Sequence, residues 1–245
     1  MRTSHAESPP SPPEPRPATL ATGVLALCSA LLLALVAAKW RPLLDVDEGI
    51  ARTTHRWAVA DPGLTQTARI LTDWIWDPWT MRVLCAAAAV LLVRRYSALW
   101  TALWLVLTVA AGTAVQQGLK AAVDRPRPVW PDPVDSAHYA AFPSGHAMTA
   151  TVVCGLLLWL LHRHGVSRAL WRTALAVAVV SVAGVGLTRV WLGVHWPTDV
   201  LGGWLLGALV VAAAIGVHRR LHPSPDGTLG VSEPFTSDDP PRRPR

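Results

Sequence analysis

Six apolar segments, separated by short polar stretches, fill most of the chain between residues 19 and 217. An α-helix needs about 20 predominantly apolar residues to cross roughly 30 Å of hydrocarbon. The predicted membrane spans are residues 19–38, 79–93, 97–119, 147–162, 170–188 and 200–217. The second span departs most from the pattern, since it carries Arg82. The pattern predicts an all-α, polytopic bundle of six membrane helices.

Polar segments flank the bundle and interrupt it once at length. Residues 1–18 and 218–245 are polar, lack periodicity and contain six prolines each, which predicts two disordered tails. The chain is thereby divided into a tail over 1–18, a membrane domain over 19–217 and a tail over 218–245. The loop 39–78 mixes apolar residues with charges, which predicts one or two amphipathic helices at the membrane interface.

The distribution of lysine and arginine bears on orientation in the membrane. With both termini in the cytoplasm, the inner side holds 12 of these residues and the outer side holds 10. The short loops at 94–95 and 163–172 carry basic residues and no acidic ones. Since short cytoplasmic loops are enriched in Lys and Arg, we expect cytoplasmic termini, a multi-pass protein of the cell membrane, and outer-face ends for the odd-numbered spans.

Composition excludes several other classes of protein. The chain is 51% hydrophobic and 16% charged, with mean hydropathy +0.32, which disfavours an ordinary soluble enzyme. Its net charge of +6 comes from basic residues that form no single stripe, so no nucleic-acid partner is expected. Three cysteines (Cys28, Cys85 and Cys154) all lie in apolar runs, which excludes a disulfide scaffold and a thiolate zinc site. Nothing in the sequence specifies an oligomeric state.

Ionisable residues gather at the ends of the last four predicted helices. Lys120 closes the third helix, with Arg127 just beyond it, and Arg189 closes the fifth. His146 opens the fourth helix, and the segment from His195 to Asp199 opens the sixth. Ends of odd helices and starts of even helices share one face of a membrane. All these residues are therefore predicted to meet on the same side, whichever way the protein is inserted.

Three of these side chains are cations that would neutralise an anion. Lys120, Arg127 and Arg189 could together neutralise a phosphate dianion and the negative charge that grows in its transition state. Ser144 is a suitable N-cap for the fourth helix, and Gly145 lets the backbone come close. The exposed N–H groups at that helix start would then point at the same anion.

The two histidines suit complementary chemical tasks. Pro197 is suited to the first position of the sixth helix, so Asp199 falls in its first turn. Asp199 could then accept a hydrogen bond from one nitrogen of His195, leaving the other nitrogen as a nucleophile. His146 is placed to protonate the leaving oxygen. No carboxylate cluster remains to hold magnesium or zinc, so we expect neither metal nor cofactor.

These residues form three motifs that resemble those of a known enzyme family. They are Lys120 followed after six residues by Arg127-Pro128, then Pro143-Ser144-Gly145-His146, then Arg189 followed by His195 and Asp199. The set, in this order, is similar to the signature of type 2 phosphatidic acid phosphatases, which belong to the superfamily that includes vanadium haloperoxidases. One departure is Thr188, where the third motif usually has serine; a hydroxyl is retained.

The resemblance implies a function and roles for the residues. It implies a membrane lipid-phosphate phosphatase in which His195 forms a phosphohistidine oriented by Asp199. His146 would act as acid and then as base, and Lys120, Arg127, Ser144, Gly145 and Arg189 would hold the phosphate. Candidate substrates by resemblance are undecaprenyl or other polyprenyl pyrophosphates, phosphatidylglycerophosphate, phosphatidic acid and lysophosphatidic acid.

Other interpretations remain open from the sequence. A phosphotransferase would pass the phosphoryl group to a lipid or sugar hydroxyl instead of water. A non-catalytic lipid or anion transporter would use the same cations for binding alone, although it would not need the paired histidines. A vanadium haloperoxidase fits less well, since haloperoxidases of that kind resemble soluble enzymes and this chain is predicted to lie in the membrane. Each residue alone also has an ordinary explanation, such as cations that reach toward lipid headgroups or a serine that only caps a helix.

Overall fold

A computed structural model describes residues 17–221, and within them the chain is helical with no strand. The long helices are α1 (Pro17–Ala37), α4 (Pro78–Tyr96), α5 (Leu99–Val123), α6 (Gly145–Arg163), α7 (Arg168–Trp191) and α8 (Pro197–Leu221). Between α1 and α4 lie α2 (Arg41–Ala60), α3 (Pro62–Ile70) and a short π-helix, η1 (Leu71–Ile75). The predicted all-α class is confirmed.

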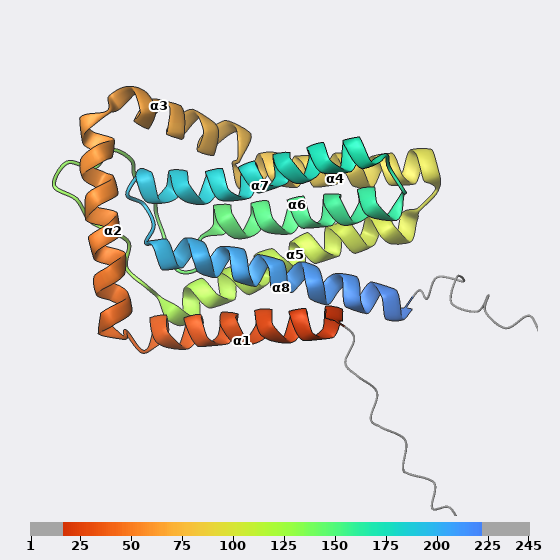
Figure 1. The fold of residues 1–245 in the computed structure, drawn as a ribbon, viewed down its shortest axis with the longest axis horizontal. Helices are drawn as coiled ribbons and strands as arrows, with labels where there is room; N and C mark the ends of the chain where they lie inside the picture. Colours follow the sequence, from red (N-terminus) through yellow and green to blue (C-terminus); the bar gives the residue numbers. More distant parts are fainter. Residues whose placement is uncertain (1–16, 222–245) are drawn as a thin grey trace, which may run out of the picture.

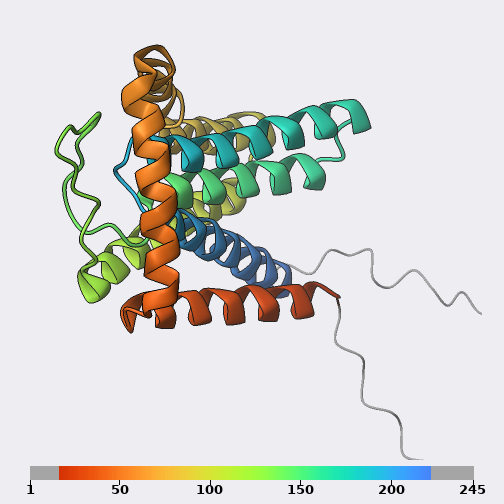
Figure 2. The same ribbon diagram turned by 60° about the vertical axis from the view of Figure 1, so that its left-hand side comes forward.

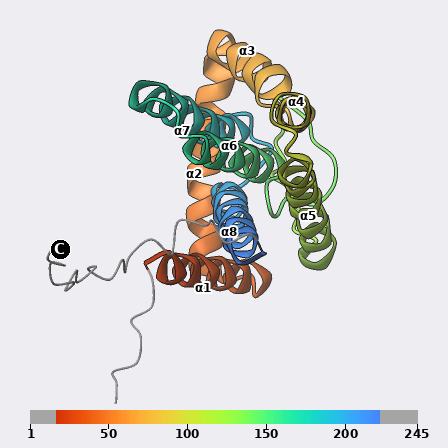
Figure 3. The ribbon, with the colours of Figure 1, turned by 90° about the vertical axis from the view of Figure 1, so that its right-hand side faces the viewer.

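The six long helices form the bundle that the apolar pattern predicts. Six segments of the described chain are long and apolar enough to cross a membrane, and the second of them continues from α3 through η1 into α4. Viewed from one end, α6 lies at the centre, surrounded by α4, α5, α7 and α8 (Figure 3). Helix α1 packs mainly against α8 at the edge of the bundle. The chain is therefore a multi-pass membrane protein.

The helices extend beyond several predicted boundaries. Helix α5 continues to Val123, so Lys120 lies inside its last turn rather than at its end. Helix α8 continues to Leu221 and α1 begins at Pro17, so the domain limits predicted at 217 and 19 each cut off part of a helix. Basic residues fit the last turn of α8, where they complement the helix dipole. The rest of both predicted tails lies outside the described residues.

The loop predicted to hold amphipathic helices contains α2 and α3. Helix α2 lies across one end of the bundle, at the opposite end from the start of α1 and the end of α8 (Figures 1 and 2). Its buried residues are Asp47, Ala51, His55 and Ala58, spaced as one stripe of a helix. The stripe faces α7 and α8, while most other residues of α2 are exposed. The one-sided character expected for this loop is confirmed.

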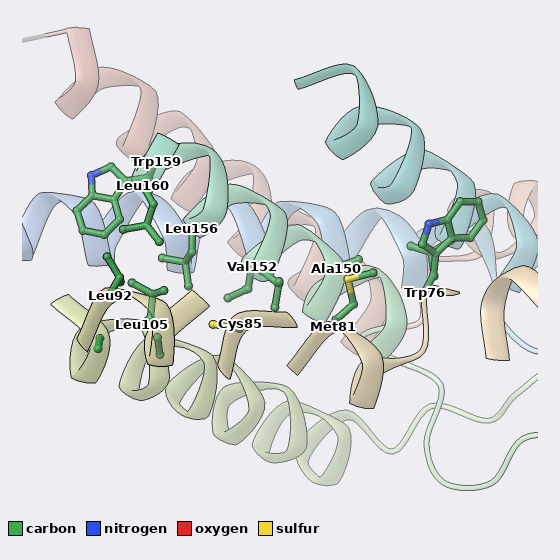
Figure 4. Close-up of a cluster of buried hydrophobic side chains, with 14 residues drawn as sticks. Trp76, Met81, Cys85, Leu92, Leu105, Ala150, Val152, Leu156, Trp159 and Leu160 are labelled. Carbon is green, nitrogen blue, oxygen red and sulfur yellow. The ribbon is translucent and has the colours of Figure 1, made fainter. Parts of the chain in front are cut away.

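The apolar core joins α4, α5, α6 and α7. Its fully buried members include Leu105, Val153, Leu156 and Val185, with Trp159 and Leu160 at one end and Trp76 at the other (Figure 4). Because lipid tails are as apolar as these side chains, close packing rather than water exclusion holds membrane helices together. This core keeps the ends of α5, α6 and α7 in a fixed relation.

Small residues bring α6 and α8 together near the start of each helix. A Cβ atom on Gly203 would lie 2.8 Å from the Ser144 carbonyl oxygen and 3.0 Å from Met148 N, so no larger residue fits there. The Ser144 backbone N–H also donates to the Asp199 carbonyl, at 2.9 Å. The beginning of α6 is thereby fixed directly against the first turn of α8.

The long connection between α5 and α6 lies beside α2 at the same end of the bundle (Figure 2). His55 of α2 stacks on Trp130, with ring centroids 4.2 Å apart, and its Nε2 lies 3.0 Å from Asp132 Oδ1. The Trp130 indole donates to the Gly193 carbonyl at 2.9 Å. These contacts join α2, the connection and the turn before α8 into one layer over the bundle end.

Candidate active site

The ends of four membrane helices surround one cavity of about 310 Å³. Lys120 reaches it from the end of α5, His146 from the start of α6 and Arg189 from the end of α7. His195 reaches it from the turn before α8, and Arg127 from the connection after α5. The prediction that alternating helix ends meet on one side of the bundle is therefore confirmed by the geometry.

Six of the eight residues predicted for the site line this cavity, namely Lys120, Arg127, Gly145, His146, Arg189 and His195. The other two, Ser144 and Asp199, are fully buried directly behind them. Residues not predicted for the site also line it, among them Asp77, Arg82, Gln116, Gln117, His138 and Tyr139.

His195 is held between a carboxylate and a guanidinium. Its Nδ1 lies 3.2 Å from Asp199 Oδ2, and its Nε2 lies 3.1 Å from Arg127 Nη1. Helix α8 begins at Pro197 as predicted, which places Asp199 in its first turn. An ionised carboxylate and a guanidinium require Nδ1 to carry the proton and Nε2 to carry the lone pair. The ring nitrogen that faces Arg127 is therefore the basic one.

Burial and positive charge both act on the His195 imidazole, which is 1% exposed. Burial lowers the pKa of this imidazole well below its ordinary value of 6.5. The positive charges of Arg127, Arg189, Lys120 and Arg125 lower that pKa further. The ring is thus kept neutral at physiological pH, the state in which a histidine can act as a nucleophile or base.

Arg127 is fixed by backbone carbonyls on two sides. It donates from Nε to Tyr139 O at 2.9 Å and from Nη1 to Val194 O at 2.6 Å. Burial, and the positive charge of Arg189, lower the pKa of the Arg127 guanidinium to about 10. It remains charged at neutral pH.

The other two cations are more deeply buried than Arg127, which is partly exposed. Lys120 is 9% exposed and its ammonium donates to the carbonyl of Ala140. Arg189 is 5% exposed, and its Nη1 lies 3.9 Å from both Asp73 Oδ1 and Asp135 Oδ2. Its Nε has no hydrogen-bond partner among the described residues. Buried cations around a cavity, with donor capacity unused, form a site for an anion.

The loop that opens α6 differs from its prediction in one detail. Ser144 occupies the N-cap position, but its hydroxyl makes no capping bond, and its Oγ is buried without a hydrogen-bond partner in the described chain. The expected side-chain cap is therefore wrong, since Ser144 is enclosed behind the cavity. The next residue is Gly145. A Cβ atom at this position would lie 2.7 Å from Gln116 Nε2, so the glycine leaves room for the Gln116 side chain.

His146 lies at the cavity with one acidic neighbour. Its Nε2 is 4.0 Å from Asp77 Oδ2, and its side chain is 21% exposed. The Asp77 carboxylate also caps α4 by accepting from Trp79 N at 2.7 Å. His146 is therefore the more accessible of the two imidazoles, and it comes from α6, whereas His195 lies in the turn before α8.

Arg125 and Asp47 contribute to the site although the sequence does not single them out. The sequence leaves open whether Arg125 pairs with Asp124, contacts lipid or takes part in the site, and the structure pairs it with two other carboxylates. Arg125 is 8% exposed and donates to Asp199 Oδ1 at 2.6 Å and to Asp47 Oδ2 at 2.7 Å. One signal in the sequence could have identified Asp47: it shares a stripe of α2 with Ala51 and Ala58, and this stripe faces the bundle.

Gly184 and Gly186 pack against Trp76 and Trp204, as glycines that permit close helix packing should.

Comparison with known proteins agrees with the motifs. The model of the PAP2 superfamily matches residues 101–223. The chain is 32% identical to phosphatidylglycerophosphatase B of Bacillus subtilis over 128 residues, which are 51% of this chain and 62% of that protein. It is 35% identical to decaprenylphosphoryl-5-phosphoribose phosphatase of Mycobacterium tuberculosis over 156 residues, which are 62% of this chain and 78% of that protein.

A solved structure has the same fold. It is the crystal structure of a transmembrane PAP2-type phosphatidylglycerolphosphate phosphatase from Bacillus subtilis, with a TM-score of 0.71 and 25% identity. The match covers 82% of this chain and 98% of that one. The sequence motifs, the family model and the fold agree, and the chain belongs to the PAP2 superfamily.

Proposed function

We propose that the protein is a membrane phosphatase that hydrolyses a phosphomonoester or pyrophosphate of an amphiphilic lipid. The observation that carries the proposal is the pair of imidazoles, His195 and His146, at one cavity with three cations, of which two are buried and one is partly buried. An anion site alone needs the cations, whereas a nucleophile with an oriented lone pair and a second proton carrier serve catalysis.

The reaction proceeds in two displacements at phosphorus. The Nε2 lone pair of His195 attacks phosphorus, the bond to the leaving oxygen breaks, and His146 gives that oxygen a proton. A phosphohistidine results, with Asp199 stabilising the cationic ring. Water then attacks phosphorus while His146 accepts its proton, and the P–N bond breaks to release phosphate. Lys120, Arg127 and Arg189 neutralise the phosphoryl oxygens throughout, so neither metal nor cofactor takes part.

An apolar surface beside the cavity supports a lipid substrate. A second hollow, of about 470 Å³, lies between α4 and α5 and is lined mainly by apolar residues, such as Ala86, Val106 and Val109. Arg82 and Gln117 line both this hollow and the catalytic cavity. A lipid can therefore place its phosphate in the cavity while its hydrocarbon chain lies in the hollow at the membrane-facing surface.

The relatives support the same substrate class. Their names specify phosphatidylglycerophosphate, decaprenylphosphoryl-5-phosphoribose and, for a Sulfolobus acidocaldarius protein that is 35% identical over 80 residues, undecaprenyl diphosphate. We include phosphatidic acid as a candidate, since it presents the same phosphomonoester on a lipid. Transfer to a second hydroxyl instead of water is the alternative within the same phosphohistidine mechanism.

The site is proposed to face the outside of the cell, with cytoplasmic termini. The basic residues at the end of α4 (94–95) and around the connection from α6 to α7 (163–172) lie at the end of the bundle opposite to α2 and the site. A cysteine introduced at exposed Gln66, in a background without the three native cysteines, should react with a membrane-impermeant maleimide on intact cells. A cysteine at exposed Ser167 should react only after permeabilisation. The reverse pattern would contradict this orientation.

Phosphate release by the purified protein tests the activity. The protein in detergent is assayed with phosphatidylglycerophosphate, phosphatidic acid, lysophosphatidic acid and undecaprenyl pyrophosphate, without an acceptor. Release of phosphate supports hydrolysis, and turnover only with an added hydroxyl acceptor supports transfer. If the protein binds a lipid phosphate, forms neither free phosphate nor a transfer product, and moves the lipid across a vesicle membrane, the transporter is supported instead.

A further inference from the structure

A buried network of charged side chains connects α2 with the first turn of α8. Asp47 and Asp199 are 0% exposed and Arg125 is 8% exposed. The Asp47 carboxylate accepts from the Thr198 backbone N–H at 2.9 Å and also from the Thr198 hydroxyl. Thr198 in turn accepts from Arg125 Nη1 at 2.7 Å. The network includes no residue that lines the cavity, so phosphate binding does not account for it.

Arg125 holds the two carboxylates through separate nitrogens. Its Nη1 donates to Asp199 Oδ1 at 2.6 Å and its Nη2 donates to Asp47 Oδ2 at 2.7 Å. A guanidinium presents its donors in a rigid plane. The distance between the two carboxylates, and the plane in which Asp199 lies, are therefore fixed by Arg125.

The two oxygens of Asp199 have different tasks as a result. Oδ1 accepts from Arg125, whereas Oδ2 accepts from Trp196 N at 2.9 Å and lies 3.2 Å from His195 Nδ1. Rotation of the carboxylate would move Oδ2 away from the imidazole. Arg125 opposes that rotation, and Asp47 holds Arg125 by an ion pair that is shielded from solvent.

We propose that Arg125 and Asp47 are positioning residues for the reaction: they orient Asp199, which orients the His195 imidazole. This inference rests on the proposed function and extends it to α2, a helix outside the three motifs. The membrane-surface helix thereby contributes to the geometry of the nucleophile, although neither Asp47 nor Arg125 touches the cavity.

The competing explanation is that the network only attaches α2 to the bundle. An attachment role predicts loss of stability, with the remaining folded enzyme fully active. A positioning role predicts a lower kcat in folded enzyme, with KM little changed, because the cations that bind phosphate are untouched. The positioning role also predicts that the loss disappears once Asp199 can no longer orient His195.

The experiment compares four variants of the full chain in detergent with a lipid phosphate that the wild type hydrolyses. Asp47→Asn keeps an oxygen for the Thr198 N–H but loses the ion pair, and we expect kcat to fall about tenfold. Arg125→Met should lower kcat about 100-fold, and Arg125→Lys, which keeps the charge but not the fork, should fall between them. Asp45→Asn, exposed on the same helix, is the matched control and should leave kcat unchanged.

The double variant Asp199→Asn with Arg125→Met separates the two explanations. We expect its kcat to lie within about twofold of that of Asp199→Asn alone, because residues acting as one unit are not additive. A full further loss in the double variant would overturn the proposal, as would wild-type kcat in both Asp47→Asn and Arg125→Lys. If Arg125→Met does not fold, the Asp47→Asn and Arg125→Lys results decide.

The outcome also distinguishes this inference from the proposed function. A wild type that turns over no lipid phosphate overturns both. An active wild type with unaffected Asp47→Asn and Arg125→Lys variants overturns the positioning role alone and leaves the phosphatase intact.

Discussion

Asp199 Oδ2 lies 3.2 Å from His195 Nδ1, across the first turn of α8. The contact exists because Pro197 starts the helix and leaves His195 just before it, so a spacing of four residues brings the two side chains together. It assigns the proton to Nδ1 and leaves Nε2 as the nitrogen that faces the cavity cations. The chemistry of the proposed phosphatase depends on this one orientation.

Replacing His195 with alanine should abolish turnover while anion binding persists. The lone pair that attacks phosphorus is removed, and we expect kcat to fall by about 10³-fold or more. Lys120, Arg127 and Arg189 remain, so vanadate, which resembles the five-coordinate transition state, should still protect the protein against thermal unfolding. His162→Ala, exposed on α6 at the far end of the bundle, is the control. Normal turnover in His195→Ala would end the assignment of the nucleophile.

Replacing His146 with alanine should impair substrates according to their leaving group. A general acid contributes about 10²- to 10⁴-fold where the leaving oxygen needs a proton. We therefore expect a large loss with a lipid alkyl phosphate and a small loss with p-nitrophenyl phosphate, whose leaving group departs as an anion. The ratio of kcat/KM for the two substrates measures this effect. Equal loss for both would argue against His146 as the acid.

Much of the fold and site follows from local sequence signals. Long apolar runs predict the membrane helices, and alternation of helix direction predicts that Lys120, His146, Arg189 and His195 meet. These inferences need only the hydropathy of each segment and the order of the motifs. The structure adds distances to an arrangement that topology already requires.

The network around Arg125 could not be predicted in the same way. Asp47 and Arg125 are 78 residues apart, and they meet only because α2 lies across the end of the bundle. Hydropathy indicates that α2 is amphipathic but does not set its direction over the other helices. The burial of the Ser144 side chain likewise depends on the close approach of α8 to α6 at Gly203.

The pH dependence of kcat/KM should be bell-shaped, because His195 must be neutral while His146 carries a proton. Burial and the charges of Arg127, Arg189, Lys120 and Arg125 lower the pKa of His195 below 6.5. His195 is protonated, and loses its lone pair, only as pH falls through that lowered value. The acid limb due to His195 should therefore lie below pH 6.5.

Arg127→Gln tests the sign of this effect. The substitution removes the largest of the charge contributions, so the pKa of His195 should rise and the acid limb should move to higher pH. Titration of the substrate phosphate affects both enzymes equally and cancels in the comparison. Arg52→Gln, exposed on α2, should leave the limb in place. Movement of the limb to lower pH in Arg127→Gln would contradict the assignment.

Chelators should leave the activity unchanged. Lys120, Arg127 and Arg189 supply the positive charge that a metal supplies in other phosphatases, and the described residues hold no group of three or more His, Cys, Asp or Glu side chains suited to a metal ion. Phosphate release is measured after dialysis against EDTA and again after magnesium is added. Inactivation that magnesium reverses would show that the mechanism is wrong.

Arg189 offers the clearest separation of phosphate binding from nucleophilic attack. It is 5% exposed, its Nε is unpaired within the described chain, and the nearest carboxylates, of Asp73 and Asp135, lie 3.9 Å from Nη1. A bound phosphate would complete this hydrogen bonding, and bonds to charged groups contribute about 1.5–3 kcal/mol each. Arg189→Gln should accordingly weaken protection by vanadate about 10- to 100-fold and raise KM. Arg189→Lys should recover the charge but not the paired donors, and so only part of the affinity. Vanadate affinity that is unchanged in Arg189→Gln would mean that the phosphate binds elsewhere in the cavity.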